Sequence, residues 1–122
     1  MQVKIKANSY SWTASIFDTP TGRLIMEALP IKGRACRWGG EIYFSIPVNE
    51  PLEPNATDLV SIGALGYWPT GNAFCIFFGP TPVSMGNEIR AASAVNIFGQ
   101  VEGDLSGLDS VADGEELTIA EA

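Results

Sequence analysis

The chain has 122 residues, of which 46% are hydrophobic, so it can bury the core of one domain and has no room for two. Fourteen acidic residues against seven basic ones give a net charge of −7, which argues against nucleic-acid binding, because that depends on basic groups that neutralise phosphates. The sequence contains no histidine. Histidine-based nucleophilic triads, histidine-ligated zinc and histidine acid–base catalysis are therefore excluded.

The sequence has the features of a cytoplasmic protein. No apolar run approaches the roughly 18–20 residues that a membrane span needs, and residues 1–7 alternate like a strand instead of forming a signal peptide. Cys36 and Cys75 are too few for a disulfide framework, so we expect two reduced thiols. We predict a single domain over residues 1–122, with no membrane partner.

The chain begins with a predicted β-hairpin and a short helix. Residues 3–7 alternate in hydrophobicity, Asn8 and Ser9 suggest a turn, and residues 10–17 are rich in strand-forming residues. A helix is predicted next, over residues 20–28, because an N-cap and a proline precede its apolar face and a second proline ends it. Such a short helix is marginal alone, so its apolar face must pack on a sheet.

The remainder of the chain predicts short strands joined by proline and glycine turns. Strands are expected over residues 34–38 and 41–46, with a tight turn at Gly39 and Gly40 between them. The further elements are a loop over 47–58, a bent strand over 59–68, a central strand over 73–78, a loop over 79–87, a strand over 94–102, a loop or helical turn over 105–111 and a closing strand over 116–120. Seven or eight short strands with one helix predict a mainly β protein, a closed or nearly closed β-barrel capped by the helix.

Several segments resemble a known group of barrels. Residues 97–103 are similar to the late barrel strand of cyclophilins and the turn that follows it. Four further segments resemble the small bacterial and archaeal cyclophilin-like proteins of unassigned function: residues 38–44, 66–71, 73–82 and 92–96. The resemblance covers about residues 38–111 and implies a cyclophilin-like barrel, but it brings no established activity.

The chain also departs from true cyclophilins at the positions that matter for catalysis. Their catalytic arginine lies in a Phe-His-Arg context that is not reproduced, and residues 38–41 only partly match their Gln-Gly-Gly-Asp stretch. The position of their site-lining histidine falls on Val95. The resemblance therefore implies no catalytic residue, and prolyl isomerisation lacks its key groups.

Aromatic residues gather around the turn at residues 69–72. Five of the twelve aromatics lie within twelve residues: Tyr67, Trp68, Phe74, Phe77 and Phe78. They could line a cleft for an extended peptide or a flat small molecule. Alternatively, Phe74, Ile76 and Phe78 fill the barrel while Phe77 packs under the helix. Tyr67 and Trp68 suit a pocket rim because each has a polar tip.

Glu41 and Tyr43 share one strand face, with Trp38 across the hairpin turn. A carboxylate with two aromatic neighbours could anchor a ligand amine or accept a proton, or the pair could simply occupy the solvent face of the strand. Arg37 could bind a carboxylate or stabilise a twisted amide, or form a surface ion pair. Cys75 is expected to be buried and Cys36 to be partly exposed.

No metal or cofactor is predicted, because no glycine-rich phosphate loop or calcium-loop spacing occurs and the seven acids of the last 22 residues suit a solvated face. We predict a non-catalytic binding module for a small molecule or peptide. The expected ligand-binding residues are Arg37, Trp38, Glu41, Tyr43, Tyr67, Trp68, Pro69, Thr81 and Pro82. The alternatives are a weak peptidyl-prolyl cis-trans isomerase and a subunit of a larger assembly, such as a homo-oligomer.

Overall fold

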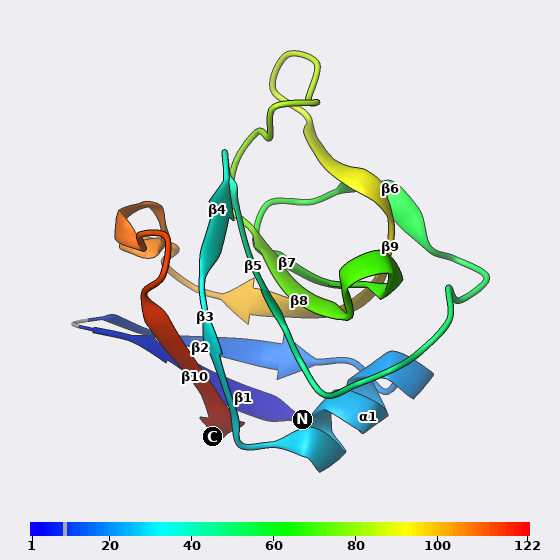
Figure 1. Cartoon of the computed structure of the whole chain (residues 1–122), viewed down its shortest axis with the longest axis vertical. Helices are drawn as coiled ribbons and strands as arrows, with labels where there is room; N and C mark the ends of the chain where they lie inside the picture. Colours follow the sequence, from blue (N-terminus) through cyan, green and yellow to red (C-terminus); the bar gives the residue numbers. More distant parts are fainter. Residues whose placement is uncertain (9) are drawn as a thin grey trace.

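The computed structural model describes residues 1–8 and 10–122 (Figure 1), so one residue of the predicted first turn, Ser9, lies outside the described residues. Its neighbour Asn8 has a φ of 41°, as a tight turn requires. The elements in chain order are β1 (Gln2–Ala7), β2 (Tyr10–Ile16), α1 (Pro20–Ala28), β3 (Ile31–Arg34), β4 (Cys36–Trp38), β5 (Glu41–Ser45), β6 (Thr57–Val60), β7 (Ala64–Trp68), the 3₁₀ helix η1 (Pro69–Gly71), β8 (Ala73–Phe77), β9 (Ile89–Glu102), the 3₁₀ helix η2 (Leu108–Ser110) and β10 (Glu116–Glu121).

The strands form one antiparallel sheet in the order β3-β10-β1-β2-β9-β7-β8-β5-β4, and β6 pairs with β9 beside this path. The two edge strands, β3 and β4, are consecutive in the chain and are separated by Ala35 alone. Because one residue joins the two edges, the sheet must curl until they meet, although no ladder of hydrogen bonds joins β3 to β4 in the described chain. The predicted nearly closed, mainly β barrel is confirmed.

Side-chain and loop contacts close the gap between the two edges. Ala35 is buried, its N–H donates to the carbonyl of Glu115 and its carbonyl accepts from the N–H of Gly114, each at 2.8 Å. Gly33 of β3 lies so close to β5 that an added Cβ would stand 2.4 Å from the ring of Phe44. Close packing therefore holds the edges together where the ladder is interrupted.

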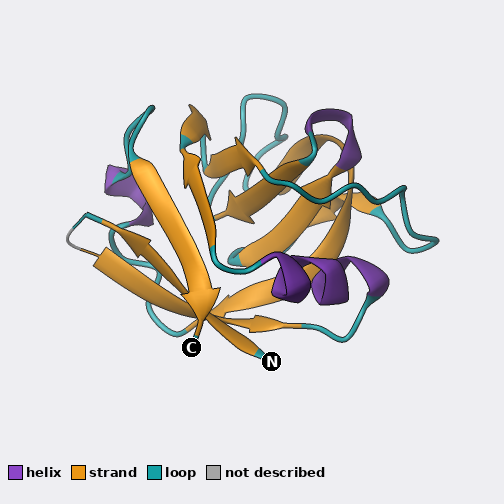
Figure 2. Ribbon diagram, turned by 60° about the horizontal axis from the view of Figure 1, so that its bottom comes forward, coloured by secondary structure: helices purple, strands orange, loops and turns teal. Residues whose placement is uncertain are grey.

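The helix has the bounds predicted for it and covers one end of the barrel (Figure 2). The Thr19 side chain is its N-cap and accepts from the N–H of Gly22 at 3.0 Å, and Ile25 is fully buried on the apolar face. A buried amide fixes the helix to the sheet, since Asn96 of β9 donates to the hydroxyl of Thr21 at 3.1 Å. The same amide accepts from the N–H of Glu53 at 2.8 Å, which ties down the 47–56 loop.

Alternation along β8 divides the core into two clusters. Phe74 and Ile76 point into the barrel, as predicted, and Phe74 stacks on Phe44 with ring centroids 5.2 Å apart. The interpretation that placed Phe77 under the helix is wrong. It lies with Cys75 in a second cluster on the other face of the sheet, because residues two apart in a strand share a face.

Three predicted strand bounds also differ from the structure. The strand expected over 34–38 is divided at Ala35 between β3 and β4, which belong to opposite edges. The bent strand expected over 59–68 is two strands, β6 and β7, and the first of them begins within the predicted loop. β9 begins five residues before the predicted start at 94, because its first residues pair with β6.

The turn between β4 and β5 depends on a close backbone approach at Gly40, where an added Cβ would lie 2.2 Å from the carbonyl carbon of Gly79. We expect Gly40→Ala to lower the free energy of unfolding by about 1–3 kcal/mol, the cost of overpacking, in a urea titration. Gly79→Ala is the matched control, because its added Cβ would meet no atom nearer than 3.7 Å. Equal stability of the two variants would contradict this account of the turn.

Candidate functional site

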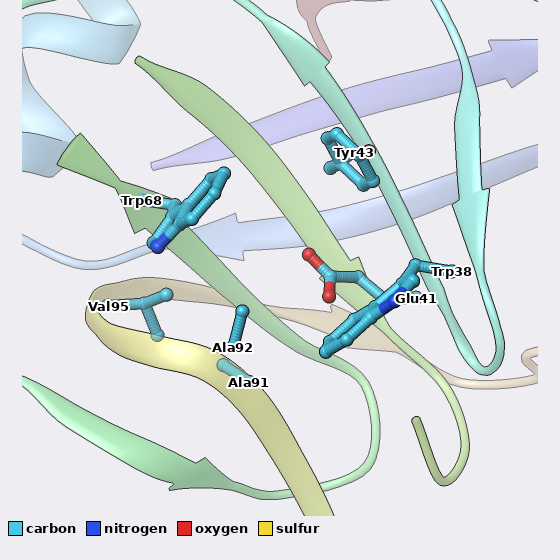
Figure 3. Close-up of a pocket in the computed structure, with 7 residues that line it drawn as sticks. All are labelled: Trp38, Glu41, Tyr43, Trp68, Ala91, Ala92 and Val95. Atoms are coloured by element: carbon cyan, nitrogen blue, oxygen red, sulfur yellow. The ribbon is translucent and has the colours of Figure 1, made fainter. Parts of the chain in front are cut away.

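A pocket of about 260 Å³ opens on the outer face of the sheet, on the side of the second core cluster. It is lined by Trp38, Glu41, Tyr43, Trp68, Ala91, Ala92 and Val95 (Figure 3). The alternation of β5 produces this arrangement, since Ile42 and Phe44 point into the barrel while Glu41 and Tyr43 point outward. An adjoining hollow of about 330 Å³ shares Tyr43 and Trp68.

Glu41 is the charged group of this pocket. Its carboxylate points into the space between the indoles of Trp38 and Trp68 (Figure 3), and the residue is only 6% exposed. None of the ion pairs in the described chain includes it. Burial raises the pKa of Glu41 to about 7, and a contact with the Cys75 thiol acts in the opposite direction. Of the two interpretations offered for Glu41, a position on the solvent face is therefore wrong.

The aromatic walls are held by specific contacts. The indole N–H of Trp68 donates to the hydroxyl of Ser93 at 2.7 Å, which fixes the ring against β9. Tyr43 is half-buried, and burial and then the neighbouring Cys36 and Glu41 raise the pKa of its phenol. Trp38 lies opposite Glu41 in the β4–β5 ladder. Three aromatic side chains therefore lie around one carboxylate that has no cationic partner in the described chain.

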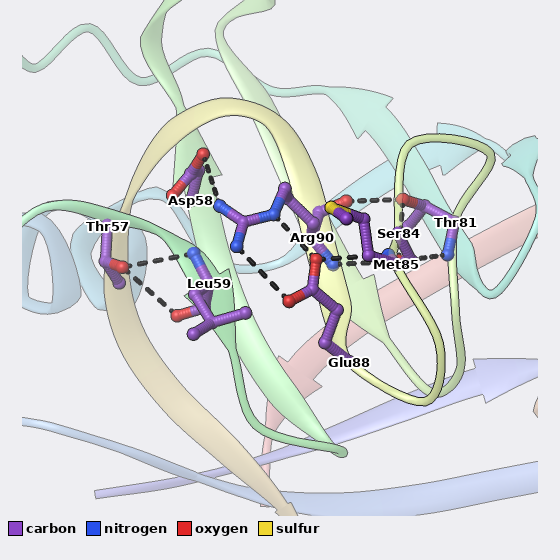
Figure 4. Close-up of polar contacts among 8 residues, drawn as sticks. All are labelled: Thr57, Asp58, Leu59, Thr81, Ser84, Met85, Glu88 and Arg90. Atoms are coloured by element: carbon purple, nitrogen blue, oxygen red, sulfur yellow. Dashed lines mark hydrogen bonds and ion pairs between the residues drawn. The ribbon is translucent and has the colours of Figure 1, made fainter.

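The small residues of the opposite wall are positioned by a polar network at the start of β9 (Figure 4). The Arg90 guanidinium donates to Asp58 at 3.0 Å and to Glu88 at 2.8 Å and 3.2 Å. The hydroxyl of Ser84 accepts from the N–H of Arg90 at 3.0 Å and from the N–H of Thr81 at 2.9 Å. Ala91 follows Arg90 directly, so this network holds the backbone at the start of the alanine wall.

The structure brings together four of the nine predicted ligand-binding residues: Trp38, Glu41, Tyr43 and Trp68. Tyr67 does not line this pocket, because it neighbours Trp68 and alternation turns it into the barrel. There its hydroxyl donates to the carbonyl of Val48 at 2.6 Å and accepts from Asn72 at 3.0 Å. The other four lie outside the lining as well: Arg37, Pro69, Thr81 and Pro82.

These four residues lie at other places in the fold, and the side chains of two of them form hydrogen bonds with the protein's own backbone. Pro69 begins η1, Pro82 is exposed, and the buried Thr81 donates its hydroxyl to the carbonyl of Arg90. The Arg37 guanidinium donates to the carbonyls of Val111 at 2.7 Å and of Asp109 and Gly39 at 2.9 Å, and it lies 5.1 Å from the centre of the Phe78 ring.

Sequence reasoning missed Ala91 and Ala92 as pocket residues. The run of small residues from 91 to 94 was a usable signal, because small side chains leave space beside a sheet. Val95 also lines the pocket, at the position where the cyclophilin pattern has a site-lining histidine. Cys75 is buried and Cys36 exposed, in agreement with prediction, and burial raises the pKa of the Cys75 thiol.

The described residues contain neither a metal-binding cluster nor a membrane-spanning helix. Residues 1–8 and 10–122 contain no cluster of three or more acidic, cysteine or histidine side chains that could hold a metal ion. Within the same residues, no helix has the length and apolar character needed to cross a membrane.

The nearly closed antiparallel barrel with a helix over one end defines the class of cyclophilin-like β-barrels. The profile of the Cyclophilin-like family matches residues 1–120, and the chain belongs to that family. It is similar to the hypothetical protein AF2241 of Archaeoglobus fulgidus, known from a solution structure, with 42% identity, a TM-score of 0.85 and coverage of 100% of this chain and 95% of the other.

A more distant likeness concerns the fold alone. The structure of McbB in complex with tryptophan matches with a TM-score of 0.68 and 11% identity, over 98% of this chain and 44% of the McbB chain. No curated protein matches the sequence.

The raised pKa of Glu41 makes stability depend on pH. Between its ordinary value of 4.5 and about 7, the folded state keeps the proton that the unfolded state has lost, so the free energy of unfolding falls as pH rises. Glu41→Gln has no titrating group at this position, so its free energy of unfolding does not fall in this way as the pH rises. Relative to the unchanged protein, we expect the variant to gain about 2–3 kcal/mol between pH 5 and pH 8, measured by urea titration.

The control is Glu116→Gln, at an exposed carboxylate of β10. No histidine titrates over the same interval, which keeps the comparison simple. A stability difference between Glu41→Gln and the unchanged protein that is the same at both pH values would show that Glu41 keeps an ordinary pKa.

Proposed function

We propose that the chain is a non-catalytic binding protein that takes a small molecule, or one side chain of a peptide, into the pocket between β4, β5, β7 and β9. The observation that carries this proposal is the convergence of three aromatic side chains on a buried carboxylate that has no cationic partner in the described chain. Ligand pockets are commonly apolar and aromatic with few oriented polar groups, and this pocket has that composition.

The surroundings of Arg37 weigh against prolyl isomerisation. An arginine that stabilises a twisted amide must direct free N–H groups at the substrate carbonyl. Both terminal nitrogens of Arg37 already donate to carbonyls of its own chain, at distances between 2.7 and 2.9 Å. Val95 also stands where the cyclophilin pattern has histidine. Binding without catalysis is therefore the favoured function, in a protein that we expect to be cytoplasmic.

The pocket can be blocked from its exposed wall. Ala92 is an exposed residue of β9 that lines the pocket, so Ala92→Phe fills the space without disturbing the core. We expect benzylamine, benzyl alcohol or benzoate to bind the unchanged protein in calorimetric titrations, and Ala92→Phe to weaken that binding at least tenfold.

Ala120→Phe is the matched control, because Ala120 is an exposed alanine of β10 outside the pocket lining. It is expected to bind as the unchanged protein does. Equal binding by Ala92→Phe would place the ligand elsewhere, and failure of all three probes to bind the unchanged protein would overturn the proposed function.

A further inference from the structure

We infer that this pocket selects organic cations, namely protonated amines that carry a small apolar group. This inference rests on the proposed binding function and specifies the chemical class of its ligand.

The charge of the pocket favours a cationic ligand. Glu41 is buried and points into the pocket, and no cation of the described chain neutralises it. The arginines of the neighbouring strands have other partners: Arg90 pairs with Asp58 and Glu88, and Arg37 contacts carbonyls and Asp109. Arg34, which lines the adjoining hollow, donates to the carbonyl of Gly114 at 3.0 Å. A carboxylate removed from water without a partner is unfavourable, and a bound cation would supply that partner. An anionic ligand would add repulsion in a protein whose net charge is already −7.

The aromatic walls of the pocket also favour a cation. Trp38 and Trp68 lie on either side of the carboxylate, and Tyr43 adds a third ring beside it (Figure 3). Aromatic faces attract cations through their quadrupoles, and tryptophan does so most strongly. The indole N–H of Trp68 is already used by Ser93, so this ring offers its apolar surface to a ligand. Aromatic rings around a carboxylate suit an ammonium group better than a neutral donor.

The size of the pocket favours a small ligand. The part of the site that Glu41 lines has a volume of about 260 Å³, below the roughly 300–1,000 Å³ of pockets for drug-sized ligands. The adjoining hollow of about 330 Å³ shares Tyr43 and Trp68 but is not lined by Glu41. Ala91, Ala92 and Val95 complete an apolar wall that can receive a ring or a short alkyl chain. The ligand is therefore a small free amine, or the amine of a single peptide side chain such as lysine. Both sources present the same ammonium chemistry.

Binding of an ammonium group should depend on pH, because the protonation of Glu41 is the only titration near neutrality among the described groups that face the pocket. β4 and β7 contribute the neutral indoles of Trp38 and Trp68, and β9 contributes alanine and valine. The titratable neighbours are Tyr43 of β5 and Cys75 of β8, and burial raises the pKa of each. Neither titrates near neutrality, so the carboxyl of Glu41, with its pKa near 7, decides whether an ammonium group meets a carboxylate or a neutral acid.

The experiment compares benzylamine with two probes of similar shape, benzyl alcohol and benzoate, by calorimetric titration at pH 8. We expect benzylamine to bind at least tenfold tighter than benzyl alcohol, and benzoate to bind more weakly than either. Glu41→Gln should remove the preference for the amine, while Glu116→Gln, at an exposed carboxylate of β10, should keep it. Nα-acetyl-lysine N-methylamide is titrated in parallel, and its affinity relative to benzylamine distinguishes a peptide side chain from a free aromatic amine.

A second arm uses the unchanged protein and so does not depend on the folding of a variant. Between pH 8 and pH 6, benzylamine stays protonated while Glu41, with a pKa of about 7, gains its proton. Benzylamine affinity should therefore fall about tenfold, while that of benzyl alcohol should not change.

The outcomes separate the two proposals. If benzyl alcohol binds as tightly as benzylamine, or if the pH arm shows no change, the selection of cations is overturned while the binding function stands. If no probe binds the unchanged protein, the proposed function fails, and the inference about its ligand fails with it.

Discussion

The barrel depends on one covalent constraint, the passage of the chain from one edge of the sheet to the other through Ala35. Residues on its two sides belong to β3 and β4, which lie at opposite ends of the strand order. Ala35 is buried, and both of its backbone hydrogen bonds go to residues 114 and 115. The curl of the sheet follows from this short connection, and the curl carries Trp38 and Glu41 to the place where β9 can face them.

The site follows from the same geometry. A strand that closes a barrel has an inner face for the core and an outer face that normally meets water. Here the early part of β9, which pairs with β6, faces the outer side of β5 across the pocket. Glu41 is therefore buried, although the alternation of apolar and polar residues along β5 is typical of a strand with one face exposed to solvent. The small side chains of Ala91 and Ala92 leave space over the carboxylate, so that this part of β9 becomes a pocket wall.

Local signals predicted much of this fold, and non-local pairing accounts for most of what they missed. Thr19 and Pro20 fix the helix start because capping is a property of adjacent residues. The alternation of residues 41–46 correctly divided inward from outward side chains. The division at Ala35 and the early start of β9 depend on partners far along the chain, which no local pattern encodes. For the same reason, the sequence could predict four pocket residues: Trp38, Glu41, Tyr43 and Trp68. The inward orientation of Tyr67 and the position of Ala91 in the pocket wall depend on how the strands pair, which the sequence pattern does not show.

The placement of the tryptophans has an optical consequence. Two of the three in the chain, Trp38 and Trp68, line the pocket, while Trp12 is 4% exposed and donates its indole N–H to the carbonyl of Ser106. A molecule entering the pocket displaces water from two indoles and leaves the third in its buried setting. The protein thus carries an intrinsic fluorescence reporter at its candidate site, with an internal reference elsewhere in the barrel.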